Sequence, residues 1–245
     1  MTLIASHRGG ALVWPENSPT AFRNTTKLPV EQVEFDVHLA RDGRLPVIHD
    51  ATVDRTTDGT GPVGEKSWAE LAALKLKGTE GERMLELHEV AEIFRSTALD
   101  LRLEIKPDVE RRRYPGLEAA IARELGRIGM LERTIITSFQ LPTLVELRRH
   151  GRPKGLIWIV LPQVQVDIGL DEAIALARRH EIPALSIRQN MLDADVVARV
   201  RAAGLGIGGW AAHDDAAIAK MLDLAVDVFT CDRPDRAVAL RAARG

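Results

Sequence analysis

Cysteine is almost absent from this sequence: Cys231 is the only one in 245 residues. A single thiol excludes an intrachain disulfide and a metal site built from several cysteines of one chain. The sequence also lacks any apolar run near the roughly 18 residues that a membrane-spanning helix needs. A strand-like segment already begins at Leu3, which leaves no room for a signal peptide. We therefore expect a soluble, cytoplasmic protein with no stable insertion into a membrane.

An excess of charge of one sign is also lacking. Lysine and arginine number 33 against 35 acidic residues, for a formal net charge of −2. This balance provides no basic surface for nucleic acid, and we interpret the run Arg111–Arg113 as a solvated loop or helix start. With 45% hydrophobic residues, the chain can form one large core. We expect one domain over residues 1–245 and a small-molecule partner, and leave a homo-oligomer open.

Short β-branched runs alternate with amphipathic segments along the chain, which is typical of βα units and a parallel sheet. The predicted strands are Leu3–Ser6, Gln32–Val37, Leu101–Ile105, Thr134–Ser138, Gly155–Val160, Ala184–Ile187, Leu205–Trp210 and Asp227–Thr230. Predicted helices between them include Leu117–Gly126, Thr143–His150, Asp171–His180, Ala194–Ala203 and Asp214–Leu224. Eight such strands favour an α/β fold of the TIM (β/α)8 barrel type over an open sheet.

A ninth strand-like run, Arg44–Ile48, follows Val37 too closely for a parallel crossover. Asp42-Gly43 between the two is a strong two-residue hairpin signal. If these two residues form the turn, paired residue numbers sum to 85, and His49 lies opposite Asp36. A bulge would shift this register.

Residues 51–97 form the longest departure from the regular alternation. A turn-rich segment, Arg55–Gly61, precedes two helical patterns over Ser67–Leu76 and Leu87–Ser96. We interpret residues 51–97 as a small insertion that caps the C-terminal face of the barrel.

Acidic residues lie on two of the predicted barrel strands. Glu34 and Asp36 are two apart, so both side chains point to the same face, while their apolar neighbours face the helices. Glu104 and Lys106 repeat this spacing on the next barrel strand. Two inward carboxylates repel each other unless a cation binds between them, and hard cations such as Mg²⁺ or Ca²⁺ prefer oxygen ligands. Glu104 and Lys106 on their own would indicate only an internal salt bridge; beside the other two acids, Glu104 is a third candidate ligand.

Two histidines and an arginine accompany the acids. His7 and Arg8 end the first strand and are followed by Gly9-Gly10, which permits close approach of a ligand to the backbone. Both side chains can reach one site only where the chain turns. Arg8 and Lys106 are suited to holding phosphate oxygens, and His7 and His49 to donating and accepting protons. Alternatively, His7 is a core histidine and Arg8 a surface residue.

Taken together, the motifs resemble those of the glycerophosphodiester phosphodiesterase family. The motifs are HRGG (7–10), PENS (15–18), EFDV (34–37), VIHD (47–50), DRTTDGTG (54–61), LEIKP (103–107), TSF (137–139) and CDRPD (231–235). Each motif is weak alone, but their joint order is highly specific and spans nearly the whole chain. The resemblance implies a TIM-barrel enzyme that hydrolyses glycerophosphodiesters to glycerol 3-phosphate and an alcohol, with Mg²⁺, Ca²⁺ or Mn²⁺ as cofactor.

The resemblance also implies a role for each matching residue. Metal ligation falls to Glu34, Asp36 and Glu104, acid–base catalysis to His7 and His49, and phosphate binding to Arg8 and Lys106. Glu16 matches a further site residue of the family, either a partner that supports the site residues or a ligand of the glycerol end; its structural alternative is an acid near the N-cap of the following helix. For Trp210 and Phe139 we expect packing against the glycerol moiety, with packing at the barrel rim as the alternative. Ala211-Ala212-His213 departs from the Thr-Val-Asn that the family often has after this tryptophan, which puts substrate contacts from that loop in doubt.

Two other functions remain open at this point. A related lyase-like or lipid-directed phosphodiesterase, of the sphingomyelinase D, phosphatidylinositol-specific phospholipase C or lysophospholipase D type, shares the paired histidines and the barrel. A non-catalytic phosphate-binding barrel would be favoured by loss of a histidine or an acid, but all of them are present. The leaving alcohol cannot be predicted, because variable loops bind that end of the substrate.

Overall fold

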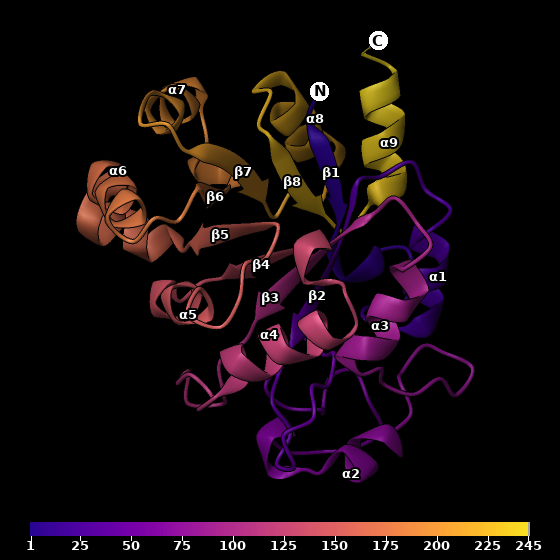
Figure 1. The fold of residues 1–245 in the computed structure, drawn as a ribbon. Coiled ribbons are helices and arrows are strands. Elements are labelled where there is room, and N and C mark those ends of the chain that lie inside the picture. Colours follow the sequence, from indigo (N-terminus) through magenta and orange to yellow (C-terminus); the bar gives the residue numbers. More distant parts are fainter. Residues whose placement is uncertain (245) are drawn as a thin grey trace.

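Eight parallel strands close into a barrel in the computed structural model, which describes residues 1–244 (Figure 1). The strands are β1 (Leu3–Ser6), β2 (Gln32–Val37), β3 (Asp100–Ile105), β4 (Thr134–Ser138), β5 (Gly155–Val160), β6 (Ala184–Arg188), β7 (Gly206–Trp210) and β8 (Val228–Cys231). Strand β8 pairs with β1, from Leu3 opposite Val228 to Ser6 opposite Cys231, and so closes the sheet. The predicted TIM barrel is confirmed, and every strand boundary lies within one residue of its prediction.

Helices surround the strands (Figure 1). They are α1 (Pro19–Thr25), α2 (Trp68–Ala72), α3 (Leu87–Phe94), α4 (Leu117–Arg127), α5 (Leu141–Leu147), α6 (Pro162–Arg179), α7 (Ala194–Ala202), α8 (Asp215–Asp223) and α9 (Pro234–Ala242). Helix α5 begins earlier than predicted because a proline in the first turn, where no intrahelical N–H is needed, is compatible with a helix. Helix α6 also begins at a proline, but Gly169, with φ 79° and ψ 163°, interrupts it, and the predicted helix corresponds to the part after this break. Within residues 1–244, no helix has the length and apolar character to cross a membrane.

The main core fills the space between the barrel and its helices. Phe22 of α1 packs edge-to-face against Phe35 of β2 and Phe94 of α3, with ring centroids 6.0 Å apart in both pairs. Phe35 points outward because it alternates with Glu34 and Asp36 along the strand. Helix α3 therefore covers the barrel as the helix between β2 and β3, although its sequence lies within the predicted insertion.

The segment after β2 turns back as a hairpin, but the predicted register is wrong. Val37 pairs with Val47, and the backbone N–H of Ala40 donates to the carbonyl of Arg44 at 2.9 Å, so paired numbers sum to 84. The loop has three residues, 41–43, and Gly43 adopts a left-handed φ of 80°. Such a loop adds one residue to the turn and shifts every following pair. Ile48, not His49, is hydrogen-bonded to the backbone of Asp36.

A second, smaller core joins this hairpin to α2 and the loops around it. Its buried members are Ala40, Ile48, Val53, Val63, Leu71 and Met84. Arg55 joins this part of the chain to the carboxyl end of the barrel, because its guanidinium binds Glu16, after β1, at 2.7 Å. The insertion into the βα repeat thus ends before Leu87, where α3 begins, and it borders the rim on which the site lies.

Candidate active site

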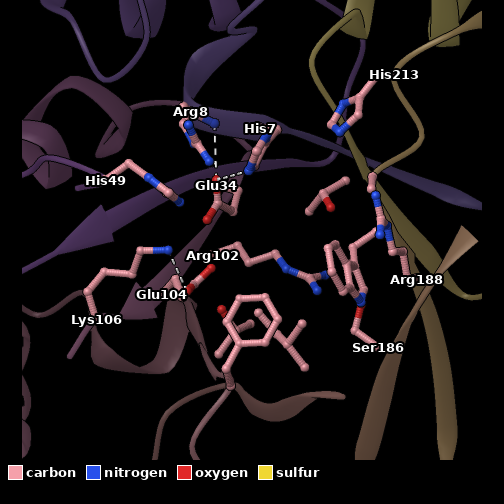
Figure 2. A pocket seen from close by; sticks show the side chains of 16 residues that line it. His7, Arg8, Glu34, His49, Arg102, Glu104, Lys106, Ser186, Arg188 and His213 are labelled. Atoms are coloured by element: carbon pink, nitrogen blue, oxygen red, sulfur yellow. Dashed lines mark hydrogen bonds and ion pairs between the residues drawn. The ribbon is translucent and has the colours of Figure 1, made fainter. Parts of the chain in front are cut away.

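A cavity of about 220 Å³ opens at the carboxyl ends of the barrel strands (Figure 2). All the predicted site residues line it except Asp36, which is fully buried, and Glu16. The lining members are His7, Arg8, Glu34, His49, Glu104, Lys106, Phe139 and Trp210. Parallel strands bring their carboxyl ends to one rim, which is why residues so far apart in the sequence meet here.

Three carboxylates form a compact cluster within this site. Glu34, Asp36 and Glu104 each place one oxygen within 4.8 Å of the other two. Asp36 and Glu104 are register partners on β2 and β3, and all three side chains are buried. Within residues 1–244, Asp36 Oδ1 has no hydrogen-bond partner, although Lys106 Nζ lies 3.2 Å away as an ion-pair partner. A buried, unsatisfied oxygen in an all-oxygen cluster fits a hard divalent cation, since Ca²⁺ ligands can be up to about 5 Å apart across the ion.

The electrostatics of these acids also favour a bound cation. Burial and the neighbouring Asp36 raise the pKa of Glu34 to about 7. Burial acts in the same direction on Asp36, but Lys106, His49 and Arg8 outweigh it and hold the pKa of Asp36 below its usual range. Two adjacent buried carboxyls therefore differ strongly in proton affinity. A cation at this position would compete with the proton on Glu34.

Arg8 reaches the site because the chain turns sharply after β1, as expected. His7–Gly9 form a single 3-10 turn in which Arg8 has a left-handed φ of 50°. The turn also needs Gly9, because a Cβ there would lie 2.8 Å from the Cβ of Ala21 on α1. The backbone N–H of Arg8 donates to Glu34 at 3.0 Å, and its Nε lies 3.6 Å from Asp36 Oδ2, an ion pair without a hydrogen bond. This guanidinium faces the acid cluster from the rim.

Each catalytic candidate histidine is held by an aspartate that the sequence reasoning did not assign. His7 Nδ1 lies 2.5 Å from Asp232, which directly follows β8, and Nε2 lies 3.8 Å from Glu34. His49 Nδ1 lies 2.6 Å from Asp50. Both imidazoles thus have one nitrogen fixed by a carboxylate and leave Nε2 for the site. Asp232 lies in the CDRPD motif and Asp50 in the VIHD motif, so these motifs were the sequence signal that could have identified both aspartates.

The charge of His7 depends on these neighbours. Burial acts to lower the pKa of His7, but Glu34 and the hydrogen bond to Asp232 raise it above the usual value. The pKa of Asp232 lies well below its usual range: burial opposes this, but hydrogen bonds to His213 and His7 outweigh it. His213 Nδ1 is 2.7 Å from the second oxygen of Asp232. The loop that departs from the family motif therefore supplies a third histidine to the site.

Another residue that was not assigned from the sequence, His38, supports His49 from behind. Its Nε2 donates to the backbone carbonyl of His49 at 3.1 Å, and its Nδ1 lies 3.1 Å from the hydroxyl of Tyr114. The ring is 1% exposed, and burial lowers the pKa of His38 to about 4, so it is neutral at pH 7. His38 fixes the backbone on which His49 stands.

The remaining predicted residues lie around the catalytic candidates. Glu16 pairs with Arg8 at 3.1 Å and with Arg55, so it orients cations and does not line the cavity. Phe139 and Trp210 pack edge-to-face with centroids 5.4 Å apart and form an aromatic wall of the cavity.

Comparisons with known proteins agree with this geometry. The model of the glycerophosphoryl diester phosphodiesterase family matches residues 7–236. A curated glycerophosphodiester phosphodiesterase from Caldanaerobacter subterraneus is 29% identical over 98% of this chain and 97% of its own length. The crystal structure of a putative glycerophosphoryl diester phosphodiesterase from Agrobacterium tumefaciens is 38% identical, with a TM-score of 0.97 over 100% of this chain and 98% of the other.

A third relative extends the comparison of folds. A phosphodiesterase from Oleispira antarctica, solved in complex with the product sn-glycerol-3-phosphate, is 23% identical over 98% of this chain and 96% of the other, with a TM-score of 0.81. At this identity it supports the shared fold alone. Because the family model matches nearly the whole chain, and the acids, histidines and cations that carry its motifs meet at one rim, the chain belongs to the glycerophosphoryl diester phosphodiesterase family.

Proposed function

We propose that this protein hydrolyses glycerophosphodiesters to sn-glycerol 3-phosphate and an alcohol, with a divalent cation held by Glu34, Asp36 and Glu104. The observation that carries the proposal is the convergence of this buried acid cluster with two carboxylate-supported histidines on one cavity. Mg²⁺, Ca²⁺ and Mn²⁺ all accept such oxygen ligands. When bound, the cation supplies Lewis-acid stabilisation of the negative charge on the phosphate.

The chain's own cations bind the phosphate in this proposal. Arg8 Nε makes no hydrogen bond within residues 1–244 and lies 3.6 Å from Asp36, while Lys106 Nζ lies 2.6 Å from Glu104 and 3.2 Å from Asp36, beside the acid cluster. The carboxylates raise the pKa of Lys106 above its usual value despite its burial, so the amine stays charged. Fixed cations beside a phosphate stabilise the charge that grows on its oxygens in the transition state.

The two histidines transfer the protons. One imidazole removes a proton from the attacking oxygen, which is water or the glycerol 2-hydroxyl, and the other protonates the departing alcohol. Asp232 and Asp50 hold the Nδ1 atoms, so that Nε2 of each ring is the nitrogen available to the substrate. Each proton-transfer role typically contributes about 10²–10⁴-fold to the rate.

A panel of glycerophosphodiesters tests the proposal. The protein is incubated with glycerophosphocholine, glycerophosphoethanolamine, glycerophosphoglycerol and glycerophosphoinositol, and released sn-glycerol 3-phosphate is measured. We expect turnover of at least one substrate, its loss with a chelator, and its recovery on adding Mg²⁺, Ca²⁺ or Mn²⁺. Phosphorus NMR of the products distinguishes hydrolysis from a lyase reaction that stops at a cyclic phosphate. Turnover that survives complete chelation would exclude the assigned role of the acid cluster.

A further inference from the structure

Arg102 is a buried arginine inside the barrel, and its charge has no ion-pair partner among the residues that the structure describes. It stands on β3 two residues before Glu104, on the same inward face, and is the register partner of Glu34. The side chain is 1% exposed and lines the cavity. Its Nη1 has no hydrogen-bond partner, and among residues 1–244 no carboxylate oxygen lies within 4.0 Å of the guanidinium. Figure 2 shows Arg102 extending into the pocket, away from Lys106 and His49.

A buried, unpaired charge destabilises a fold, so its presence calls for a counter-ion. Glu34 and Glu104 attract Arg102 by Coulombic interaction without a hydrogen bond, and both belong to the proposed metal cluster. Lys106 and a divalent cation match the three negative charges of that cluster, and Arg8 pairs with Glu16. Arg102 takes part in none of these pairs.

Two more unsatisfied donors line the same cavity. The indole Nε1 of Trp210 and the hydroxyl of Ser186 are buried and have no hydrogen-bond partner in the part of the chain that the structure describes. Arg188 lies at the rim, 5.6 Å from the centre of the Trp210 ring. Among the described residues, the only acids that line the cavity are Glu34 and Glu104. The part of the wall formed by Arg102, Ser186, Arg188 and Trp210 therefore presents hydrogen-bond donors and positive charge but no carboxylate of its own. Figure 2 shows Arg102 extending toward Ser186 and Arg188.

We propose that Arg102, Ser186 and Trp210 bind a second anionic group of the substrate, a carboxylate or a phosphate, beyond the phosphodiester at the metal cluster. This inference rests on the proposed function and specifies its substrate class: phosphodiesters that carry an additional negative charge. A guanidinium pairs with either anion through parallel N–H donors, and an indole N–H can only donate. A quaternary ammonium such as choline would be disfavoured here, because Arg102 and Arg188 already carry positive charge.

A set of matched product ligands tests this site by binding, independently of turnover. In 3-phosphoglycerate a carboxylate replaces the terminal hydroxymethyl group of glycerol 3-phosphate, and in glycerol 1,3-bisphosphate a phosphate is added at the same end. Calorimetry in the presence of Ca²⁺ should show that at least one of them binds the wild-type protein tenfold or more tightly than glycerol 3-phosphate. The ligand that is preferred identifies the anion. Equal affinities for all three would overturn the proposal.

Variants assign any preference to its residues. Arg102→Met should abolish the preference, Arg102→Lys should retain part of it, and Trp210→Phe should weaken it by removing only the indole N–H. Arg23→Met is the matched control, because Arg23 is a largely exposed arginine whose nearest acidic partner, Glu82, is 3.8 Å away. A preference that persists in Arg102→Met, with its fold verified by thermal unfolding, would also overturn the proposal. If Arg102→Met does not fold, Arg102→Lys and Trp210→Phe decide instead: an undiminished preference in both variants would overturn the proposal. Turnover of neutral-ended glycerophosphodiesters without any preference would contradict this site alone and leave the proposed function standing.

Discussion

Asp232 accepts a hydrogen bond from His7 across 225 residues of sequence, and its other oxygen binds His213. One carboxylate at the end of β8 thereby fixes an imidazole at the end of β1 and another after β7. Because β8 closes the barrel against β1, this arrangement exists only once the barrel is complete. Asp232 is thus a positioning residue for His7.

Replacing Asp232 with Asn should lower kcat by about 10²–10⁴-fold, because the amide can no longer hold His7 in the tautomer and orientation that expose Nε2. KM should change much less, since Asp232 does not line the cavity. The pH profile should shift as well, because the support for the charged form of His7 is lost. Asp235→Asn, which breaks only a surface pair with Arg233, is the control. An unchanged pH profile would argue that Asp232 acts only on stability.

His7→Ala and His49→Ala should each lose about 10²–10⁴-fold in activity while the fold survives, because each removes one proton-transfer group. Circular dichroism and thermal unfolding verify the fold, and steady-state rates measure the loss. His150→Ala is the matched control, since this ring pairs with Glu146 on the surface. Near-normal turnover in either catalytic-site variant would remove that histidine from the mechanism.

A divalent cation should stabilise the folded protein against unfolding. At a concentration about 100 times its Kd, it adds about 2.7 kcal/mol to the free energy of unfolding. Glu34→Gln and Glu104→Gln should lose most of this increment, which is measured by denaturant titration with and without Ca²⁺ or Mg²⁺. Glu118→Gln is the control, because Glu118 is also buried but pairs with Arg113 away from the cluster. Equal increments in all three variants would contradict the ligand assignment.

Acid should destabilise the protein partly through His38. Its pKa is about 4 in the folded protein against about 6.5 for an unperturbed histidine, so the unfolded chain binds the proton more readily between these values. Stability from this group is therefore full above about pH 6.5 and is lost as the pH falls toward 4, by about 3 kcal/mol in all. His38→Gln, which can still donate to the His49 carbonyl, should flatten this part of the curve in urea titrations. A variant curve parallel to that of the wild type would refute the assignment.

The strand and helix pattern could be predicted because it is a local property. In β2, Glu34 and Asp36 alternate with Phe35 and Val37, and this alternation alone predicts which side chains face the barrel interior. The hairpin shows the limit of such reasoning. Asp42-Gly43 correctly located the turn, but the three-residue loop depends on Gly43 in a left-handed conformation, which the dipeptide alone does not specify.

The sequence by itself determined that eight βα units follow one another and that acids, imidazoles and cations stand at strand ends, because periodicity and residue chemistry are written locally. Only the tertiary structure decided which of these groups meet. Closure of the barrel paired Asp232 with His7, the hairpin placed His38 behind His49, and the interior left Arg102 without a partner. These relationships depend on distances between residues far apart in the chain, which the order of residues alone does not specify.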